Sequence, residues 1–158
     1  MSQTDELEGK PLPAFDLPTD GGGQVSNADF TGKMLVLYIY PKDDTSGCTK
    51  ESIGFMEAYQ DFQAAGAEIV GLSKDGVKSH DKFKAKYNFP FTLLADEDTK
   101  LIDALGSWVE KSMYGKKYMG ADRSTFLVDG SGAIQKVWRK VKVPGHVDEV
   151  LKAVKSMT

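Results

Sequence analysis

The sequence has 158 residues, of which 41% are hydrophobic and 27% charged, and its 20 basic and 23 acidic residues give a net charge of −3. This composition is typical of a globular chain that buries a core without disulfides or metals, and we expect one domain over residues 1–158. The slight acidity argues against a surface for nucleic acids or anionic membranes. A single cysteine cannot form an internal disulfide, which fits a reducing compartment.

The amino-terminal segment 1–10 is polar and acidic and lacks the apolar centre of a secretory signal. No apolar run in the sequence approaches the length of a membrane span. We therefore expect a cytoplasmic protein that does not enter a membrane, with residues 1–10 loosely ordered. Residues 14–27 contain the turn signal Asp20-Gly21-Gly22-Gly23 and predict a small hairpin ahead of the main fold.

Apolar runs and helical periodicity alternate along the rest of the chain. Five apolar runs predict strands: residues 34–40, 67–72, 91–95, 124–128 and 133–138. Helices are expected from Cys48 to Gly66, from the N-cap Asp75 to the residue before Pro90, over 99–104, and from Pro144 onward. Residues 106–121 predict a long loop. This order matches an α/β, thioredoxin-like fold with a central mixed sheet flanked by helices.

Cys48 lies where the buried strand 34–40 passes into an amphipathic helix. In the first turn of a helix, a thiol faces unpaired N–H groups and the positive end of the helix dipole, and both favour the thiolate. Free cysteines are commonly buried and unreactive, but the flanking pairs 46–47 and 49–50 are small or polar here. We therefore expect Cys48 to be a reactive nucleophile.

The stretch 40–51 reads Tyr-Pro-Lys-Asp-Asp-Thr-Ser-Gly-Cys-Thr-Lys-Glu and contains the spacing Pro41-x-x-x-Thr45-x-x-Cys48. It resembles the active-site signature of the peroxiredoxins, and over its full length that of the peroxiredoxin Q, or bacterioferritin comigratory protein, branch. The resemblance continues in order along the chain, in Ser73-Lys74-Asp75, Lys86-Tyr87-Asn88-Phe89-Pro90-Phe91, Arg123-Ser124-Thr125-Phe126 and Val143-Pro144-Gly145-His146. It implies an antioxidant, thiol-dependent peroxidase that uses no cofactor and no metal.

The resemblance implies a role for four side chains. Cys48 attacks the peroxide, Thr45 orients it, and Pro41 shields the thiolate from water. Arg123 stabilises the thiolate and the oxygens of the breaking O–O bond, since neighbouring strands would bring it toward the Cys48 turn. Taken alone, Thr45 could be a loop or capping hydroxyl, Pro41 could end the strand, and Arg123 could be a solvated charge at a strand edge.

Other side chains have less specific assignments. Glu51 shares a helix face with Cys48 and could hold Arg123 by a charge-assisted hydrogen bond, or could complement the helix dipole. Four residues could form an apolar rim for alkyl peroxides or belong to ordinary packing: Tyr40, Phe89, Trp108 and Met113. His80 and His146 have no Cys or carboxylate at ligand spacing, so we assign them surface or capping roles and no metal.

The sequence departs from the branch five residues after Cys48, where many members carry a second cysteine and this chain has Ile53. The resemblance therefore implies that an external thiol resolves the Cys48 sulfenic acid: a thioredoxin, a glutaredoxin or a low-molecular-weight thiol such as glutathione. Without an internal disulfide, excess peroxide should over-oxidise the cysteine. We expect a monomer.

Two other functions stay open at this point. A monothiol-type thiol–disulfide transferase would suit the fold, although the positions three before and three after Cys48 are Thr45 and Glu51, so no Cys-x-x-Cys pair exists. A binding module could use Cys48 as a redox sensor. A sensor, however, does not require Pro41, Thr45 and Arg123 around its cysteine.

Overall fold

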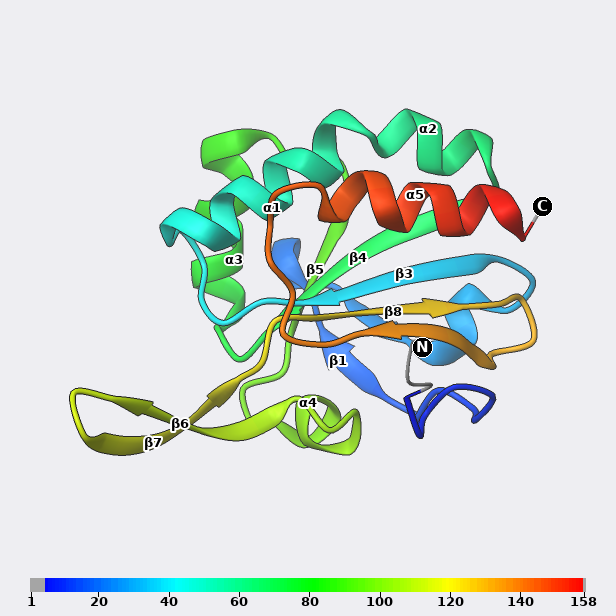
Figure 1. The fold of residues 1–158 in the computed structure, drawn as a ribbon. Coiled ribbons are helices and arrows are strands. Elements are labelled where there is room, and N and C mark those ends of the chain that lie inside the picture. Colours follow the sequence, from blue (N-terminus) through cyan, green and yellow to red (C-terminus); the bar gives the residue numbers. More distant parts are fainter. Residues whose placement is uncertain (1–4, 158) are drawn as a thin grey trace.

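The computed structural model describes residues 5–157, which are built around a five-stranded sheet in the order β5-β4-β3-β8-β9 (Figure 1). The strands are β3 (Met34–Ile39), β4 (Ala67–Ser73), β5 (Thr92–Ala95), β8 (Ser124–Val128) and β9 (Ile134–Trp138). Strands β3, β4 and β5 run parallel, whereas β8 is antiparallel to β3 and β9 is antiparallel to β8. The central mixed sheet that the sequence predicted is therefore confirmed.

Two core clusters lie on opposite faces of this sheet, because successive side chains of a strand point to opposite sides. The helices are α1 (Ser46–Glu57), α2 (Tyr59–Ala64), α3 (Val77–Tyr87), α4 (Lys100–Ala104) and α5 (His146–Ser156). On one face, Tyr38 of β3 packs with Phe55 of α1, and on the other Leu37 belongs to a cluster with Ile102 of α4. Figure 1 shows α1, α2 and α5 on one side of the sheet and α4 on the other. Within residues 5–157, no helix combines the length and apolar character needed to cross a membrane.

The amino-terminal hairpin is present as predicted. Strand β1 (Asp16–Pro18) pairs antiparallel with β2 (Gln24–Ser26), and the short 3-10 helix η1 (Asp20–Gly22) connects them. A second 3-10 helix, η2 (Asn27–Phe30), leads into β3.

The segment that we expected to be loosely ordered, 1–10, is described only in part, since residues 1–4 lie outside the described range. Residues 5–10 contact the rest of the chain, and their loose order stays a prediction. The Asp5 carboxylate forms an ion pair with Arg139, at 2.8 Å from Oδ2 to Nε. This partner comes from the far end of the chain, which the composition of the segment does not reveal.

The helix after Cys48 is divided in two. The backbone leaves the helical region at Ala58, with φ −95° and ψ 1°, so that α1 ends there and α2 follows. Gly66 then follows the last turn with a φ of 85°, in the left-handed region that glycine adopts without steric cost. The predicted stop at Gly66 is therefore confirmed, and the single helix is not.

Two predicted helix starts are wrong. The N-cap of α3 is Gly76, and the carboxylate of Asp75 makes no capping bond but accepts hydrogen bonds from the hydroxyl of Ser73 and the N–H of Asp43. The last helix, α5, begins after Gly145 and not at Pro144. Gly145 has a φ of 78°, which breaks helical geometry between the proline and the first turn.

Residues 106–121 are not the long loop that we predicted. Most of them form an antiparallel hairpin of β6 (Trp108–Met113) and β7 (Lys116–Ala121), which projects from the body of the molecule (Figure 1). Its two-residue turn, Tyr114-Gly115, has φ values of 52° and 79°. Turns of this kind favour Asn or Gly at both positions. Because the first position here is a tyrosine, the sequence carries no recognisable signal for this turn.

The pairing of β8 with β3 decides where the site forms. Ser124, the first residue of β8, lies opposite Ile39, the last residue of β3. Arg123 precedes β8 and is therefore brought next to the loop that leaves β3 and leads into α1.

Candidate active site

Cys48 lies in the first turn of α1, after the carboxyl end of the central strand β3. It is 1% exposed. Thr45 is the N-cap, and its carbonyl accepts a hydrogen bond from the N–H of Thr49 at 2.8 Å. The N–H groups of this first turn have no carbonyl partner inside the helix and form the positive end of its dipole. The thiol therefore occupies the helix start that the sequence predicted.

The guanidinium of Arg123 connects Cys48 with Glu51. Its Nη2 donates to Sγ of Cys48 at 3.4 Å, and its Nη1 donates to Oε1 of Glu51 at 2.8 Å. Burial opposes the charge on Arg123, but the negative charges of Glu51 and Cys48 outweigh burial and raise the pKa of the arginine. The side chain is thus a fixed cation that donates a hydrogen bond to the sulfur.

Glu51 is fully buried, and only one oxygen of its carboxyl group is paired. Its Oε2 has no hydrogen-bond partner among residues 5–157. Burial raises the pKa of Glu51 from 4.5 to about 7, although the charge and hydrogen bond of Arg123 lower it. Near neutral pH, the carboxyl group that holds the arginine therefore exists in both protonation states.

Gly47 has a packing role that the sequence did not reveal. A Cβ at this position would lie 3.0 Å from Nη2 of Arg123, closer than ordinary van der Waals contact. The guanidinium therefore lies over the backbone of the residue before Cys48. Glycine permits this close approach because it has no side chain.

Thr45 and Pro41 belong to the loop that leads to Cys48. The hydroxyl of Thr45 donates to the carbonyl of Lys42 at 2.8 Å and makes no capping bond to α1, so of the two alternatives it is a loop hydroxyl and not a capping one. Pro41 comes two residues after the end of β3 and is half-buried, which suits a residue that ends a strand. Unlike Arg123, neither side chain makes a hydrogen bond to Cys48 in the described part of the chain.

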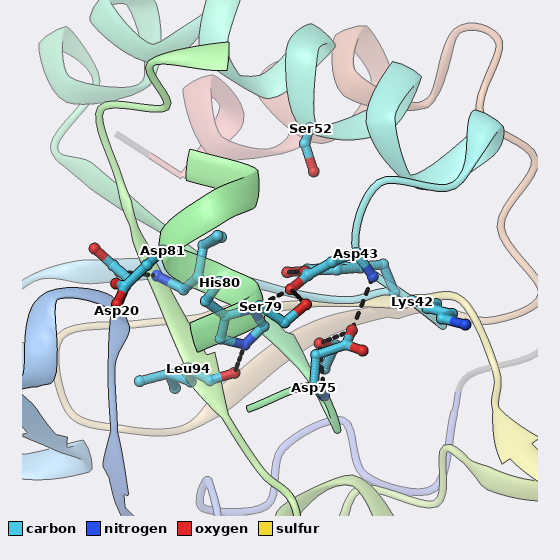
Figure 2. A network of polar contacts seen from close by, with 12 residues as sticks. Asp20, Lys42, Asp43, Ser52, Asp75, Ser79, His80, Asp81 and Leu94 are labelled. Atoms are coloured by element: carbon cyan, nitrogen blue, oxygen red, sulfur yellow. Dashed lines mark hydrogen bonds and ion pairs between the residues drawn. The ribbon is translucent and has the colours of Figure 1, made fainter. Parts of the chain in front are cut away.

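A second set of polar side chains is centred on Asp43 of this loop and connects it to α3. The sequence analysis did not predict this set. The Asp43 carboxylate accepts hydrogen bonds from the hydroxyls of Tyr40 at 2.6 Å and Ser79 at 2.8 Å, and Nδ1 of His80 lies 2.7 Å from it. Figure 2 shows His80 between Asp43 and Leu94, whose carbonyl lies 2.8 Å from Nε2. Asp43 and His80 are 37 positions apart in the chain, so no motif spacing indicates their contact.

Both histidines are buried, at 0% exposure for His80 and 4% for His146, so the predicted surface or capping roles are wrong. Burial opposes the charge on His80, but the hydrogen bond and charge of Asp43 and the carbonyl of Leu94 outweigh it and raise its pKa. Burial lowers the pKa of His146 to about 4, and its Nε2 lies 2.8 Å from the hydroxyl of Thr125. Between residues 5 and 157, no group of three or more His, Cys, Asp or Glu side chains is arranged to hold a metal.

The four residues proposed for an apolar rim do not gather at one place. Tyr40 and Phe89 are buried in the core on one face of the sheet, whereas Trp108 packs against the core on the other face. Met113, at the end of β6, is 57% exposed. The alternative of ordinary packing holds for the three aromatic residues.

Comparisons with known proteins place this site in a family. Residues 9–137 match the AhpC/TSA family. A putative peroxiredoxin bcp of Coxiella burnetii is 52% identical over 143 residues, which cover 90% of this chain and 95% of that protein.

Solved structures agree with this family. A cysteine mutant of Xanthomonas campestris peroxiredoxin Q has a TM-score of 0.88 and 46% identity, covering 91% of this chain and 92% of that one. A structure of the bacterioferritin comigratory protein of the same organism, from work on its alkyl peroxide reduction activity, has a TM-score of 0.87 and 46% identity, with 90% of this chain and 91% of that one covered. The predicted thioredoxin-like fold is thereby confirmed. The chain belongs to the AhpC/TSA family and is a peroxiredoxin of the Bcp, or peroxiredoxin Q, branch, and hence a thiol-dependent peroxidase.

Proposed function

We propose that Cys48 is the residue with which this peroxidase reduces hydrogen peroxide and organic hydroperoxides. The observation that carries the proposal is the 3.4 Å contact between Nη2 of Arg123 and Sγ of Cys48, with the other arm of the guanidinium fixed by Glu51. The thiolate is the nucleophilic form of cysteine, and a fixed cation beside it both favours that form and offers donors to an incoming oxygen. The work on alkyl peroxide reduction by the similar Xanthomonas campestris protein supports the inclusion of organic hydroperoxides.

The reaction follows from these positions. The Cys48 thiolate attacks the terminal oxygen of R–O–O–H, an S–O bond forms as the O–O bond breaks, and the products are a sulfenic acid and RO⁻, which takes a proton from solvent. Arg123 and the N–H groups at the start of α1 stabilise the charge that develops on the oxygens. In this proposal Thr45 orients the peroxide, Pro41 limits the access of water, and Glu51 holds Arg123 in place.

An external thiol completes the cycle, because the chain has no second cysteine. The first thiol displaces the sulfenic oxygen as water and forms a mixed disulfide with Cys48. A second thiol then releases the Cys48 thiol and leaves as the oxidised reductant. A thioredoxin, a glutaredoxin or a low-molecular-weight thiol fits this chemistry, and we infer a monomer that works in the cytoplasm, where such thiols are kept reduced.

Stopped-flow oxidation of the reduced protein tests the proposal. We expect hydrogen peroxide and a small alkyl hydroperoxide to be consumed rapidly, with one equivalent of sulfenic acid formed on Cys48 and no reaction in Cys48→Ser. Addition of candidate thiols one at a time then identifies the reductant. Oxidation no faster than that of a free thiol at the same pH contradicts the proposal. Reduction of mixed disulfides without peroxide consumption would favour the transferase, and a redox-dependent partner without turnover would favour the sensor.

A further inference from the structure

We propose that Asp43, held by His80, is a positioning residue of this peroxidase. Its proposed action is to fix the loop 41–45, which follows β3 and leads into α1, and thereby to place Thr45 and Cys48 for attack on the peroxide. The inference rests on the proposed function, because it concerns the same cysteine. Asp43 makes no hydrogen bond to Cys48 or Arg123 in the described chain and acts only through the loop.

The bonds of Asp43 join the loop to three other parts of the chain. Its carboxylate accepts from Tyr40, the residue after β3, and from Ser79 and His80 in α3. Its backbone N–H donates at 2.8 Å to the carboxylate of Asp75, which follows β4. Figure 2 shows Asp43 and Asp75 side by side in this network. The loop is therefore fixed through a side chain and a backbone group of the same residue.

The partner of Asp43 is a charged histidine. The carbonyl of Leu94 can only accept, so Nε2 of His80 carries a hydrogen, and the Asp43 carboxylate accepts on the Nδ1 side. With a hydrogen on both ring nitrogens, His80 is a cation. The side chains of His80 and Asp43 are 0% and 3% exposed, so this is an ion pair almost wholly removed from water.

A buried ion pair is a weak source of net stability, because the cost of removing both charges from water offsets most of their attraction. What such a pair can supply is a single conformation, and the conformation here is an uncommon one. Asp44 has a φ of 58°, in a region that residues other than glycine seldom occupy. Its carboxylate accepts from Lys86 at 2.9 Å and from Tyr87 at 3.1 Å. Helix α3 thus holds both acidic residues that immediately precede Thr45.

The test compares two reactions of Cys48 in the full-length protein. Asp43→Asn keeps the shape of the side chain and removes its charge. We expect its rate constant with hydrogen peroxide to fall by about tenfold or more, since a displacement of about 1 Å can cost about a hundredfold in an oriented reaction. Alkylation by iodoacetamide should keep the wild-type rate, because it needs the thiolate beside Arg123 and no oriented peroxide.

Lys84→Met is the matched control. It breaks another ion pair of α3, with Asp20, which has the same 2.7 Å length but does not reach the loop. We expect this variant to keep both rates. An equal loss of peroxide reactivity in Lys84→Met would overturn the proposal, because any disturbance of α3 would then suffice.

Two further results would also overturn it: a folded Asp43→Asn protein with the wild-type peroxide rate, or one in which peroxide and alkylation rates fall together. If Asp43→Asn does not fold, Ser79→Ala serves the same test. It removes one donor from Asp43 while keeping the ion pair, and we expect a smaller but selective loss of peroxide reactivity. A wild-type rate in Ser79→Ala then counts against the proposal. Failure of the proposed function is recognised separately, since the wild-type protein would itself react no faster than a free thiol.

Discussion

Two buried ion pairs stand close to the start of α1, and they differ in how completely their carboxylates are bonded. The Arg123–Glu51 pair has a distance of 2.8 Å and side chains 16% and 0% exposed. The His80–Asp43 pair has a distance of 2.7 Å and side chains 0% and 3% exposed. Asp43 accepts from three side chains, whereas Oε2 of Glu51 has no partner between residues 5 and 157.

The difference matches what each pair contacts. Arg123 divides its donors between Glu51 and the sulfur of Cys48, so Glu51 receives one hydrogen bond, and burial raises its pKa to about 7. Asp43 contacts no reacting atom, and each of its oxygens is occupied. A buried carboxylate with few donors is costly in its charged form, which is why burial raises the pKa of Glu51. We therefore expect the Arg123–Glu51 pair to affect the reactivity of Cys48, and the His80–Asp43 pair to fix the backbone of the loop 41–45.

Removal of the cation should have the largest effect on the reaction. Arg123→Met keeps an apolar stem but removes the donors that face Cys48 and the developing oxygen charges. We expect the rate constant with hydrogen peroxide to fall by about 10²- to 10³-fold, the usual loss for a preorganised donor. Stopped-flow oxidation of the reduced variant measures it.

The control for this loss is Arg139→Met. Arg139 also holds a carboxylate at 2.8 Å, that of Asp5, but it makes no hydrogen bond to Cys48 or Glu51. The Arg139→Met variant should be less stable than the wild type but should keep the wild-type rate constant with hydrogen peroxide. If Arg123→Met reacts as fast as Arg139→Met, the guanidinium beside the sulfur does not assist the reaction.

The raised pKa of the buried Glu51 carboxyl group should make the stability of the folded protein depend on pH. Its folded pKa of about 7 lies above the ordinary pKa of 4.5, so between these pH values the folded protein binds a proton that the unfolded chain releases. Stability contributed by the protonated form is therefore present below pH 4.5 and is lost as the pH rises to about 7. From the shift, the free energy of unfolding should fall by up to about 3 kcal/mol over this window.

Urea denaturation of the reduced protein at pH 5 and pH 8 measures this change. Glu51→Gln cannot ionise, so its stability should lack this decrease and should exceed that of the wild type most at pH 8. Parallel pH profiles of stability for the two proteins would show that the Glu51 carboxyl group does not titrate in this window. That result would contradict the proposed difference between Glu51 and Asp43.

The His80–Asp43 pair should also make the stability of the protein depend on pH. Burial opposes the charge on His80, but the hydrogen bond and charge of Asp43, the carbonyl of Leu94 and the charge of Asp75 outweigh it and raise the pKa of His80 above 6.5. Stability from the pair is present below pH 6.5 and is lost as the pH rises through the folded pKa. His146, with a pKa of about 4, stays neutral throughout this range.

Proton NMR of the two histidine rings distinguishes them, with His80→Gln to assign the signals. One ring should remain protonated at pH 6.5 and titrate above it, and the other should titrate near pH 4. Two rings that titrate together near 6.5 would contradict an ion pair between His80 and Asp43.

Local patterns explain which parts of this molecule were predictable. The apolar run 34–40 and the helical period after Cys48 depend on neighbouring residues, and strand and helix formed where they indicated. The contact of Arg123 with Cys48 spans 75 positions, but it was expected because a family resemblance and the adjacency of strands both point to it. Glu51 was likewise expected to reach Arg123, since it shares a helix face with the cysteine.

The parts that escaped prediction depend on contacts or backbone angles that no local pattern records. Tyr114 takes a left-handed conformation seldom seen for tyrosine, so the hairpin at 108–121 gave no turn signal. Asp43 and His80 meet only because α3 packs behind the loop, and a histidine without ligand spacing looks like a surface residue. Gly47 was noted merely as small, whereas its close contact with Arg123 is visible only in three dimensions.

That contact of Gly47 gives the smallest and most specific test of the Arg123–Glu51 pair. In Gly47→Ala the new Cβ would lie 3.0 Å from Nη2 of Arg123, so the guanidinium must shift by a few tenths of an ångström. We expect the peroxide rate constant to fall by about two- to fivefold, because small displacements of a positioned group carry small costs. Gly54→Ala is matched to it, being in the same helix with a Cβ 3.0 Å from Cγ2 of Val147 in α5. Both variants gain about 1 kcal/mol of helix propensity, so only a loss confined to position 47 reports on Arg123. Equal rates in the two variants would mean that the guanidinium moves aside without consequence, and that its alignment is less strict than that of the loop held by Asp43.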